Sequence, residues 1–543
     1  MSINFSILGN ALSKPLGIVA SGHKETSNAA RVLLEEGGNA FDAALGAMCA
    51  ACVCEPLLAS LGGGGFLLAQ AAGQDAGVFD FFTQTPSATT NGPGGELDFY
   101  PIQADFGPAT QEFHIGLGSM AVPGVVAGLF AIHKAHCSLP LEKIIEPAVY
   151  LAREGVRINA LQKFISEILH PIVNATPEAE ALLRPMFAPG RLAEIGEFIA
   201  NPDLADTFEL LAKHGPRWFY DDAPGQQLAR DCAERGGLIT LDDLASYDVI
   251  QRKPVTIKTH GATISLNSPP SPGGCLVAFA LSLLDKDGQA GNMHGNMGEY
   301  EWGGVEHTMK IARVMQASGI VRRQHGMATG LDDETAEKIL QAENLSKWRE
   351  TIRTGGLASR GTTHLSVADA EGNLASLTLS NGEGSSYVLP GSGIMLNNML
   401  GEEDLNPNGF HQMPAGVRLA SMMTPTIVKL ADGGQIALGS GGSNRIRSAI
   451  LQVLVNMLEF DMGLEQAVNS PRMHLEGSHL SVETGFPDAA LQSLAESWPG
   501  MQEWPESNLF FGGVHAVERL ANGEFRAAGD PRRGGATAIA IKP

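Results

Sequence analysis

The chain has 543 residues, of which 37 are Lys or Arg and 59 are Asp or Glu, giving a formal net charge of −22. A hydrophobic fraction of 44% with 18% charged residues is typical of a folded chain with a large core, and it excludes disorder over most of the length. The negative charge argues against nucleic acid as a partner, because it would repel a phosphate backbone. The longest apolar run, residues 43–54, is too short to span a bilayer, so we expect no membrane association.

The N-terminus carries no basic segment followed by an apolar one, so we expect an unexported, cytoplasmic protein. Three of the six cysteines, Cys49, Cys52 and Cys54, share one apolar segment, which predicts reduced thiols rather than a disulfide framework. The unusual number is 65 glycines, roughly 12% of the chain against an average near 7%. Many occur in clusters such as 62–65 and 92–95, which predicts close approach of backbone to backbone or to a ligand.

Two helices are expected between residues 27 and 56. Ser27 or Asn28 can begin the first, Gly37 and Gly38 end it, and Asn39 can cap the second. The second helix is apolar on every side, which predicts that it is buried. Strands are expected at residues 66–71 and 78–82.

The stretch from about 123 to 360 is mostly helical in pattern. The helices are expected at residues 125–136, 141–155, 161–173, 204–215 and 305–324. From 361 onward the pattern is alternating and β-branched. Residues 362–380 predict a hairpin with its turn at 369–373. Further strands are expected at 426–430, 435–438, 513–518 and 536–541, with one long helix at 444–460.

Several common catalytic motifs are absent, among them the phosphate-binding loop, H-E-x-x-H and G-x-S-x-G. Cys49, Cys52 and Cys54 could form a metal cluster, but a helix would place them on different faces, so we favour core packing. His133, His136 and Cys137 resemble a ligand triplet, but their spacing on an ordinary helix favours a surface position. We therefore expect no metal and no organic cofactor.

The segment Gly361-Thr362-Thr363-His364 places a hydroxyl at the start of a predicted strand, directly after a glycine. Cleavage between Gly361 and Thr362 would give Thr362 both an Oγ nucleophile and a free α-amine that can act as its base. Taken alone, the same residues are also what any strand could contain.

The residues around it resemble the gamma-glutamyltranspeptidase family, over nearly the whole length. The segments that carry the resemblance, in order, are VASGHKETSNAARVLLEEGGNAFDAALGA, EPLLASLGGGGFLL, MAVPGVVAGL, PAVYLAREG, PPSPGG, TTHLSVADAEGNLASLT, GIMLNNM, SMMTPTIV, GSGGSNRI, NSPRMH and GDPRRGGA. The resemblance implies an α+β fold of the Ntn-hydrolase type, a four-layer αββα sandwich made from one precursor. The inactive precursor, a zymogen, would cleave itself between Gly361 and Thr362. Its helix-rich large subunit, residues 1–361, and strand-rich small subunit, residues 362–543, would remain together as a heterodimer.

The resemblance also implies roles for individual residues. Thr362 would be the nucleophile, and Gly441 and Gly442 would supply the oxyanion hole. The family's Ser-Pro-Gly-Gly-Ser is offset by one residue here, so Ser443 could contribute as well. Ser380 corresponds to a second threonine near the nucleophile. An asparagine two residues later corresponds to Gly382, with Asn381 adjacent as a possible replacement.

Substrate-binding residues depart further from the family pattern. Phe82 stands where the family has an arginine that holds the glutamyl α-carboxylate, a contact worth roughly 1.5–3 kcal/mol. Of two adjacent serines that share this role, Ser421 remains and Met422 replaces the other. Glu402, in the acidic segment 401–404, corresponds approximately to the residue that holds the substrate amine; the alternative is a solvated acidic loop.

These residues favour a self-processing N-terminal-threonine amidohydrolase or acyltransferase. It would act on γ-glutamyl groups of glutathione or related amides, with water or an amino acid or peptide as acceptor. The first alternative is an acylase for amides without the amino-acid head, such as glutaryl amides. The second is a non-catalytic member that stays unprocessed. Because the best-known bacterial members are exported, a periplasmic location is the alternative to the cytoplasm.

Overall fold

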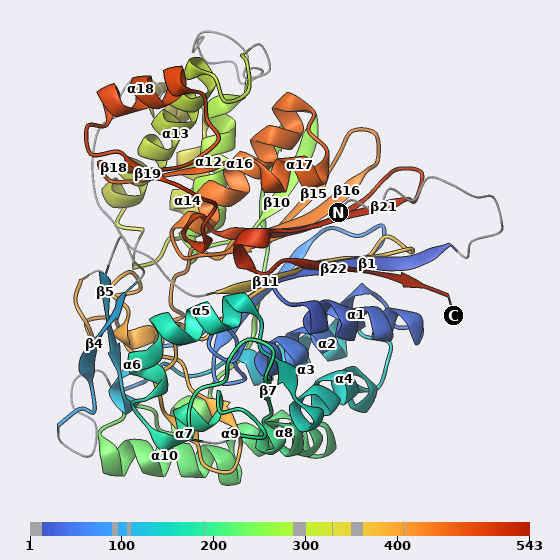
Figure 1. Ribbon diagram of the computed structural model, residues 1–543, viewed down its shortest axis with the longest axis vertical. Helices are drawn as coiled ribbons and strands as arrows, with labels where there is room; N and C mark the ends of the chain where they lie inside the picture. The colour runs from blue at the N-terminus through green and yellow to red at the C-terminus, as the bar shows by residue number, and fades with distance from the viewer. Residues whose placement is uncertain are drawn as a thin grey trace.

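The computed structural model describes residues 14–88, 96–105, 110–188, 190–285, 300–327, 329–348, 362–406 and 408–542. Two β-sheets, one of seven strands and one of six, pack face to face at the centre of the molecule. Helices cover the outer face of each sheet (Figure 1). The fold is therefore a mixed α+β structure.

The seven-stranded sheet has the order β22-β1-β11-β12-β2-β3-β8, and every neighbouring pair is antiparallel. Its strands are β1 (Pro15–Ser21), β2 (Gly64–Gln70), β3 (Gly77–Phe81), β8 (Ile250–Arg252), β11 (Thr363–Asp369), β12 (Leu374–Ser380) and β22 (Ala536–Ile541). The predicted hairpin is confirmed as β11 and β12. Both strands are buried along their whole length, because neighbouring strands and both adjacent layers cover them.

The six-stranded sheet has the order β21-β20-β16-β15-β10-β9. Its strands are β9 (Val255–Thr259), β10 (Ala262–Leu266), β15 (Thr426–Lys429), β16 (Gln435–Gly441), β20 (Gly513–Arg519) and β21 (Phe525–Gly529). The expectation that residues 123–360 are mostly helical is wrong at β8, β9 and β10. A turn at His260 and Gly261, both with positive φ, joins β9 to β10, and apolar residues alternate along β10.

The layer on the seven-stranded sheet contains α1 (Lys24–Glu35), α2 (Ala40–Cys54) and α3 (Val125–His136), and α4 (Leu141–Glu154) packs against α2. Every residue of α2 is buried, as its apolar surface predicts, and Asn39 caps it in a capping box with Asp42. The predicted start of α1 is wrong: the His23 side chain caps the helix, and Ser27 and Asn28 lie inside it.

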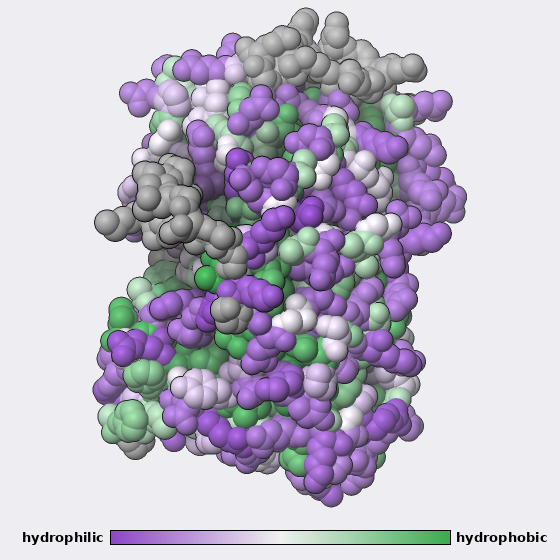
Figure 2. All heavy atoms as spheres, turned by 90° about the vertical axis from the view of Figure 1, so that its right-hand side faces the viewer, coloured by the Kyte–Doolittle hydropathy of each residue, from purple (hydrophilic) through white to green (hydrophobic). Residues whose placement is uncertain are grey.

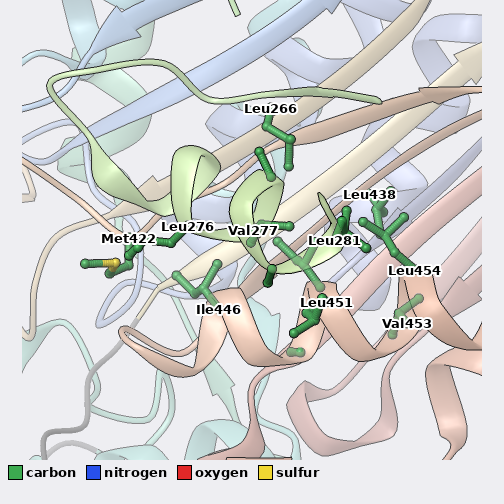
Figure 3. Packing of buried hydrophobic residues seen from close by; sticks show 14 of the residues in the cluster. Leu266, Leu276, Val277, Leu281, Met422, Leu438, Ile446, Leu451, Val453 and Leu454 are labelled. Atoms are coloured by element: carbon green, nitrogen blue, oxygen red, sulfur yellow. The ribbon is translucent and has the colours of Figure 1, made fainter. Parts of the chain in front are cut away.

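The outer layer on the six-stranded sheet contains α12 (Pro272–Leu284) and α16 (Arg445–Phe460), with α13 (Val305–Gln324) packed against α12. Figure 3 shows Leu276 and Leu281 of α12 facing Ile446 and Leu451 of α16. Met422 lies at the end of the same cluster. The apolar core thus continues toward the segment before β15.

Shorter elements surround these layers. The remaining helices are α5 (Ala160–Ile168), α6 (His170–Val173), α7 (Pro177–Ala181), α8 (Pro202–His214), α9 (Pro216–Tyr220), α10 (Ala223–Arg235), α11 (Leu241–Ala245), α14 (Asp333–Leu340), α15 (Ala342–Trp348), α17 (Leu464–Asn469) and α18 (Asp488–Ser497). The small sheets contain β4 (Tyr100–Asp105), β5 (Thr110–Ile115), β6 (Val156–Arg157), β7 (Phe198–Ile199), β13 (Val388–Leu389), β14 (Ile394–Met395), β17 (Met473–Glu476), β18 (His479–Glu483) and β19 (Gln502–Trp504).

All six cysteines are free, and only Cys137 is partly exposed, so the prediction of reduced thiols within the core is confirmed for the other five. His136 is not simply a surface residue, because its ring stacks on Phe41 with the ring centroids 4.5 Å apart. In the described ranges, no three His, Cys, Asp or Glu side chains are grouped as a metal site. None of the described helices has the length and apolar content that crossing a bilayer requires. The face in Figure 2 is mostly hydrophilic.

Candidate active site

One pocket of about 490 Å³, measured out to open solvent, brings together four of the predicted site residues. Thr362 precedes β11, Ser380 ends β12, Glu402 follows a 3-10 turn at Met399–Gly401, and Ser421 lies before β15. Gly361 is outside the described residues. The four residues come from segments well separated in the sequence, which the hairpin and the two sheets bring to one place.

Thr362 occupies a tightly packed position and is only 4% exposed. Thr363 pairs with Leu379 in the hairpin. Extending this register by one residue places Thr362 opposite Ser380 at the open end of the hairpin. Arg533 donates from Nη1 to the Thr362 carbonyl oxygen over 3.3 Å. Gly441 also packs against this carbonyl, since a Cβ at Gly441 would lie 2.0 Å from the same oxygen. The backbone of Thr362 is therefore held from two sides.

Of the predicted oxyanion glycines, Gly441 ends β16 and Gly442 begins the turn that follows, and neither lines the pocket. Gly442 has φ +122° and Ser443 has φ +53°, and Ser443 and Asn444 line the pocket. The left-handed conformation costs a non-glycine residue about 1–3 kcal/mol, so it needs support from its surroundings. Asp404 gives that support: its Oδ2 accepts from Ser443 Oγ and from Asn444 Nδ2, each at 3.2 Å. Sequence reasoning missed Asp404.

Ser380 and Asn381 behave differently although they are adjacent. Ser380 lines the pocket, and its Oγ accepts from the Gly382 amide over 3.1 Å. Asn381 is fully buried and does not line the pocket. Its side-chain Nδ2 lies 3.4 Å from the Met395 carbonyl oxygen. The structure thus places Asn381 in the wall behind the pocket.

Glu402 is 2% exposed and faces the pocket, while its neighbour Glu403 is exposed. The alternative of a solvated acidic loop is therefore wrong for Glu402. At Gly382 a Cβ would lie 2.2 Å from both Glu402 Oε1 and Asn398 Oδ1. A side chain at Gly382 would collide with Glu402, so the glycine there and the long acidic side chain fit each other.

One wall of the pocket is apolar. Phe82 lines it and packs on Phe66 with ring centroids 5.3 Å apart, and Met422, Met399 and Ile446 continue the wall. Arg322, on α13, also lines the pocket, and it is the one Lys or Arg among the described lining residues. Nothing in the sequence spacing relates Arg322 to Thr362, and sequence reasoning missed it.

Behind Thr362, Glu55 at the end of α2 is 5% exposed and accepts from Thr363 Oγ1 over 3.0 Å. Its second oxygen has no hydrogen-bond partner among the described residues. Burial raises the pKa of Glu55 to about 7, against which the bond from Thr363 and the charge of Arg533 act. Glu55 therefore titrates near neutral pH while it contacts Thr363, the residue that follows Thr362.

Replacing Glu55 with Gln is expected to flatten the pH dependence of stability. The folded pKa of about 7 exceeds the unfolded value of 4.5, so the stability is fully present below pH 4.5 and is lost as pH rises through 7. The loss amounts to about 3 kcal/mol. The test is urea unfolding at pH 5 and pH 8 of two proteins, Thr362→Ala and Thr362→Ala combined with Glu55→Gln. The Thr362→Ala background is used because it is expected to prevent cleavage, so both proteins have one covalent state. Equal pH dependence in the two would show that Glu55 does not titrate this way.

Comparisons with known proteins agree with this architecture. The family model described as Gamma-glutamyltranspeptidase matches residues 26–540. The "Glutathione hydrolase proenzyme" of Escherichia coli (strain K12) is 28% identical over 550 residues, covering 95% of this chain and 90% of that protein. The "Acylase ACY 1 proenzyme" of Pseudomonas sp. (strain SE83) is also 28% identical, over 541 residues, with 97% and 93% covered.

Among solved structures, cephalosporin acylase from Bacillus halodurans is similar with a TM-score of 0.82, covering 100% of this chain and 99% of that one. Its sequence identity is 23%, so the likeness concerns the fold. The equal identity to a glutathione hydrolase and to an acylase gives no preference between their substrates.

Proposed function

The chain belongs to the gamma-glutamyltranspeptidase family, and we propose that it is a self-processing amidohydrolase or acyltransferase whose nucleophile is Thr362. The observation that carries this proposal is that Thr362 lines one pocket with Ser380, Glu402 and Ser421. A hydroxyl nucleophile, a second hydroxyl and a buried carboxylate in one pocket suit acyl transfer from an amide with a polar acyl group.

In the processing step, Thr362 Oγ attacks the Gly361 carbonyl carbon, and the Gly361–Thr362 C–N bond breaks. The Thr362 nitrogen takes up the hydroxyl proton and becomes the free α-amine, and water then hydrolyses the ester. The contacts of the Thr362 carbonyl with Arg533 and Gly441 support this proposal, because they hold the backbone in place while the bond on its N-terminal side is broken.

In turnover, the α-amine of Thr362 accepts the proton from Oγ as Oγ attacks the substrate amide. The amides of Gly441 and Gly442, with that of Ser443 in the same turn, are the candidate donors to the oxyanion that forms. The leaving amine then receives this proton from the α-ammonium group and departs, and the acyl group remains as an ester on Thr362 Oγ. Water or an amine then takes the acyl group.

Processing would leave two chains joined through both sheets, because β9 and β10 of the larger chain continue the six-stranded sheet beside β15 of the smaller one. A cut before Thr362 assigns β1, β2, β3 and β8 to residues 1–361 and β11, β12 and β22 to residues 362–543. Because β1 pairs with β11 on one edge and β22 on the other, separating the chains would break both ladders. We therefore expect an Ntn-hydrolase sandwich of four layers built by a heterodimer.

The proposed donors are γ-glutamyl amides, with glutathione as one of them. Glu402 supports this choice, since a buried carboxylate in the pocket can hold the α-amine of a glutamyl group. The second candidate, an acylase for glutaryl-type amides, is favoured by Phe82 and Met422, which line the pocket with apolar surface.

Turnover of γ-glutamyl and glutaryl p-nitroanilides separates these candidates. If Glu402 holds an amine, the γ-glutamyl compound is expected to have the higher kcat/KM, by roughly 10-fold or more. Glu402→Gln should then reduce that preference, because the amide lacks the negative charge. A preference for the glutaryl compound that Glu402→Gln leaves unchanged would assign the second candidate instead.

A further inference from the structure

We propose that Arg322 is a specificity-determining residue that binds a carboxylate on the acyl group of the donor. The substrate class is then amides whose acyl chain carries a carboxylate away from the scissile bond. This inference rests on the proposed function, because it needs the pocket around Thr362 to be the acyl-binding site.

Arg322 reaches the pocket from α13, which lies outside both sheets. Its side chain is 12% exposed, so it keeps only a small part of its surface in contact with solvent. The apolar wall that includes Phe82, Met327 and Met422 lines the same pocket. In such surroundings the attraction between a guanidinium and a carboxylate is stronger than in water.

Two described groups fix the position of Arg322. Its Nη1 donates to Asn444 Oδ1 over 3.1 Å and lies 3.5 Å from Glu476 Oε1. Glu476 also pairs with Arg447 through its other oxygen. One carboxylate thus serves two guanidinium groups, and burial keeps the nearby His474 neutral by lowering its pKa well below the usual range. The two guanidinium groups that share Glu476 favour an anionic group beside Arg322, and Asp404, which bonds to Asn444 and also lines the pocket, is the opposing charge.

Other arginines near the site have different tasks. Arg533 bonds to the carbonyl oxygens of Thr362 and Leu509. Arg418 lies 3.5 Å from Asp80 and stacks over the Tyr247 ring at 4.5 Å. Neither lines the pocket, whereas Arg322 does. A planar guanidinium can bind a carboxylate through two parallel hydrogen bonds, which an ammonium cannot do.

The pocket also carries side chains of opposite charge that can bind the head group of the donor's acyl chain. Glu402 and Arg322 line the same cavity from different segments. A γ-glutamyl donor offers an amine to Glu402 and a carboxylate to Arg322, while a glutaryl donor offers the carboxylate alone. If Arg322 binds this carboxylate, the γ-glutamyl and glutaryl donors are both preferred over an acyl chain that ends in a methyl group.

The test compares glutaryl and pentanoyl p-nitroanilides, which have the same chain length but differ in the terminal carboxylate. For wild type we expect glutaryl to be preferred. Arg322→Gln should lower kcat/KM for glutaryl roughly 10- to 100-fold, mainly through KM, and change the value for pentanoyl by less than about 3-fold. Arg322→Lys should retain part of the preference. Glutarate should inhibit wild type competitively and Arg322→Gln at least about 10-fold less well.

Arg323→Gln is the matched control, because Arg323 is the next residue on the same helix but is exposed and outside the pocket. If Arg322 only braces Asn444, Arg322→Gln should lower kcat for both anilides equally, and that result overturns the inference. Unchanged selectivity in Arg322→Gln overturns it as well. Both outcomes leave the proposed function standing. A wild-type chain that stays uncut and hydrolyses none of these anilides contradicts the proposed function itself.

Discussion

Replacing Thr362 with Ala is expected to leave a single uncut chain of 543 residues without amidase activity. The substitution removes the Oγ that attacks the Gly361 carbonyl, and without cleavage no α-amine forms to act as the base. The side chain is small and the site is buried next to β11, so the fold should persist. Activity should fall by at least about 10⁴-fold, as expected when a nucleophile is removed.

Thr362→Ser is the matched variant, because it keeps the hydroxyl and the position of the amine. It should be cleaved, more slowly than wild type, and retain measurable turnover. Denaturing gels and a chromogenic amide assay on all three proteins give the comparison. An Ala variant that is cut, or that is active while uncut, would contradict the role given to Thr362.

The second large effect is expected from Gly441→Ala. Its φ is not in the left-handed region, so the effect is steric: the new Cβ would lie 2.0 Å from the Thr362 carbonyl oxygen. The end of β16 or the nucleophile must therefore move. Because a shift near 1 Å at a reacting group can cost on the order of 100-fold, turnover should fall by about that factor.

Gly77→Ala provides the control for Gly441→Ala. Gly77 also lies in a strand, at the start of β3, but a Cβ there has no heavy atom within 4 Å. It should keep wild-type cleavage and turnover. Rates of chain cleavage and of amide hydrolysis measured for both variants check the argument. Full activity in Gly441→Ala would show that its contact with Thr362 has no role in catalysis.

Local patterns in the sequence were sufficient to predict the central elements. The apolar, capped segment gave α2, and the turn between alternating segments gave the hairpin of β11 and β12. The glycines at 62–65 are close to backbone as expected, since a Cβ at each would lie 2.4–2.7 Å from a backbone atom. The cluster at 92–95 is outside the described residues. These features depend on neighbours in the chain, which is why they could be predicted.

The composition of the pocket depends on tertiary structure and was only partly predictable. Arg322 lies on a helix beyond the second sheet, and Asp404 belongs to an acidic segment whose residues face in different directions. The fit between Gly382 and Glu402 likewise appears only when β12 and the later loop are side by side. The hairpin of β9 and β10 was missed because helices flank it on both sides.

The central claim is that the chain cuts itself before Thr362 and uses the new terminus as nucleophile. The most direct test is the mass of the purified wild-type protein under denaturing conditions, together with N-terminal sequencing of the smaller product. The account predicts two chains, with the smaller one beginning Thr-Thr-His-Leu at Thr362. A single intact chain with full activity, or a small chain that begins elsewhere, would contradict it.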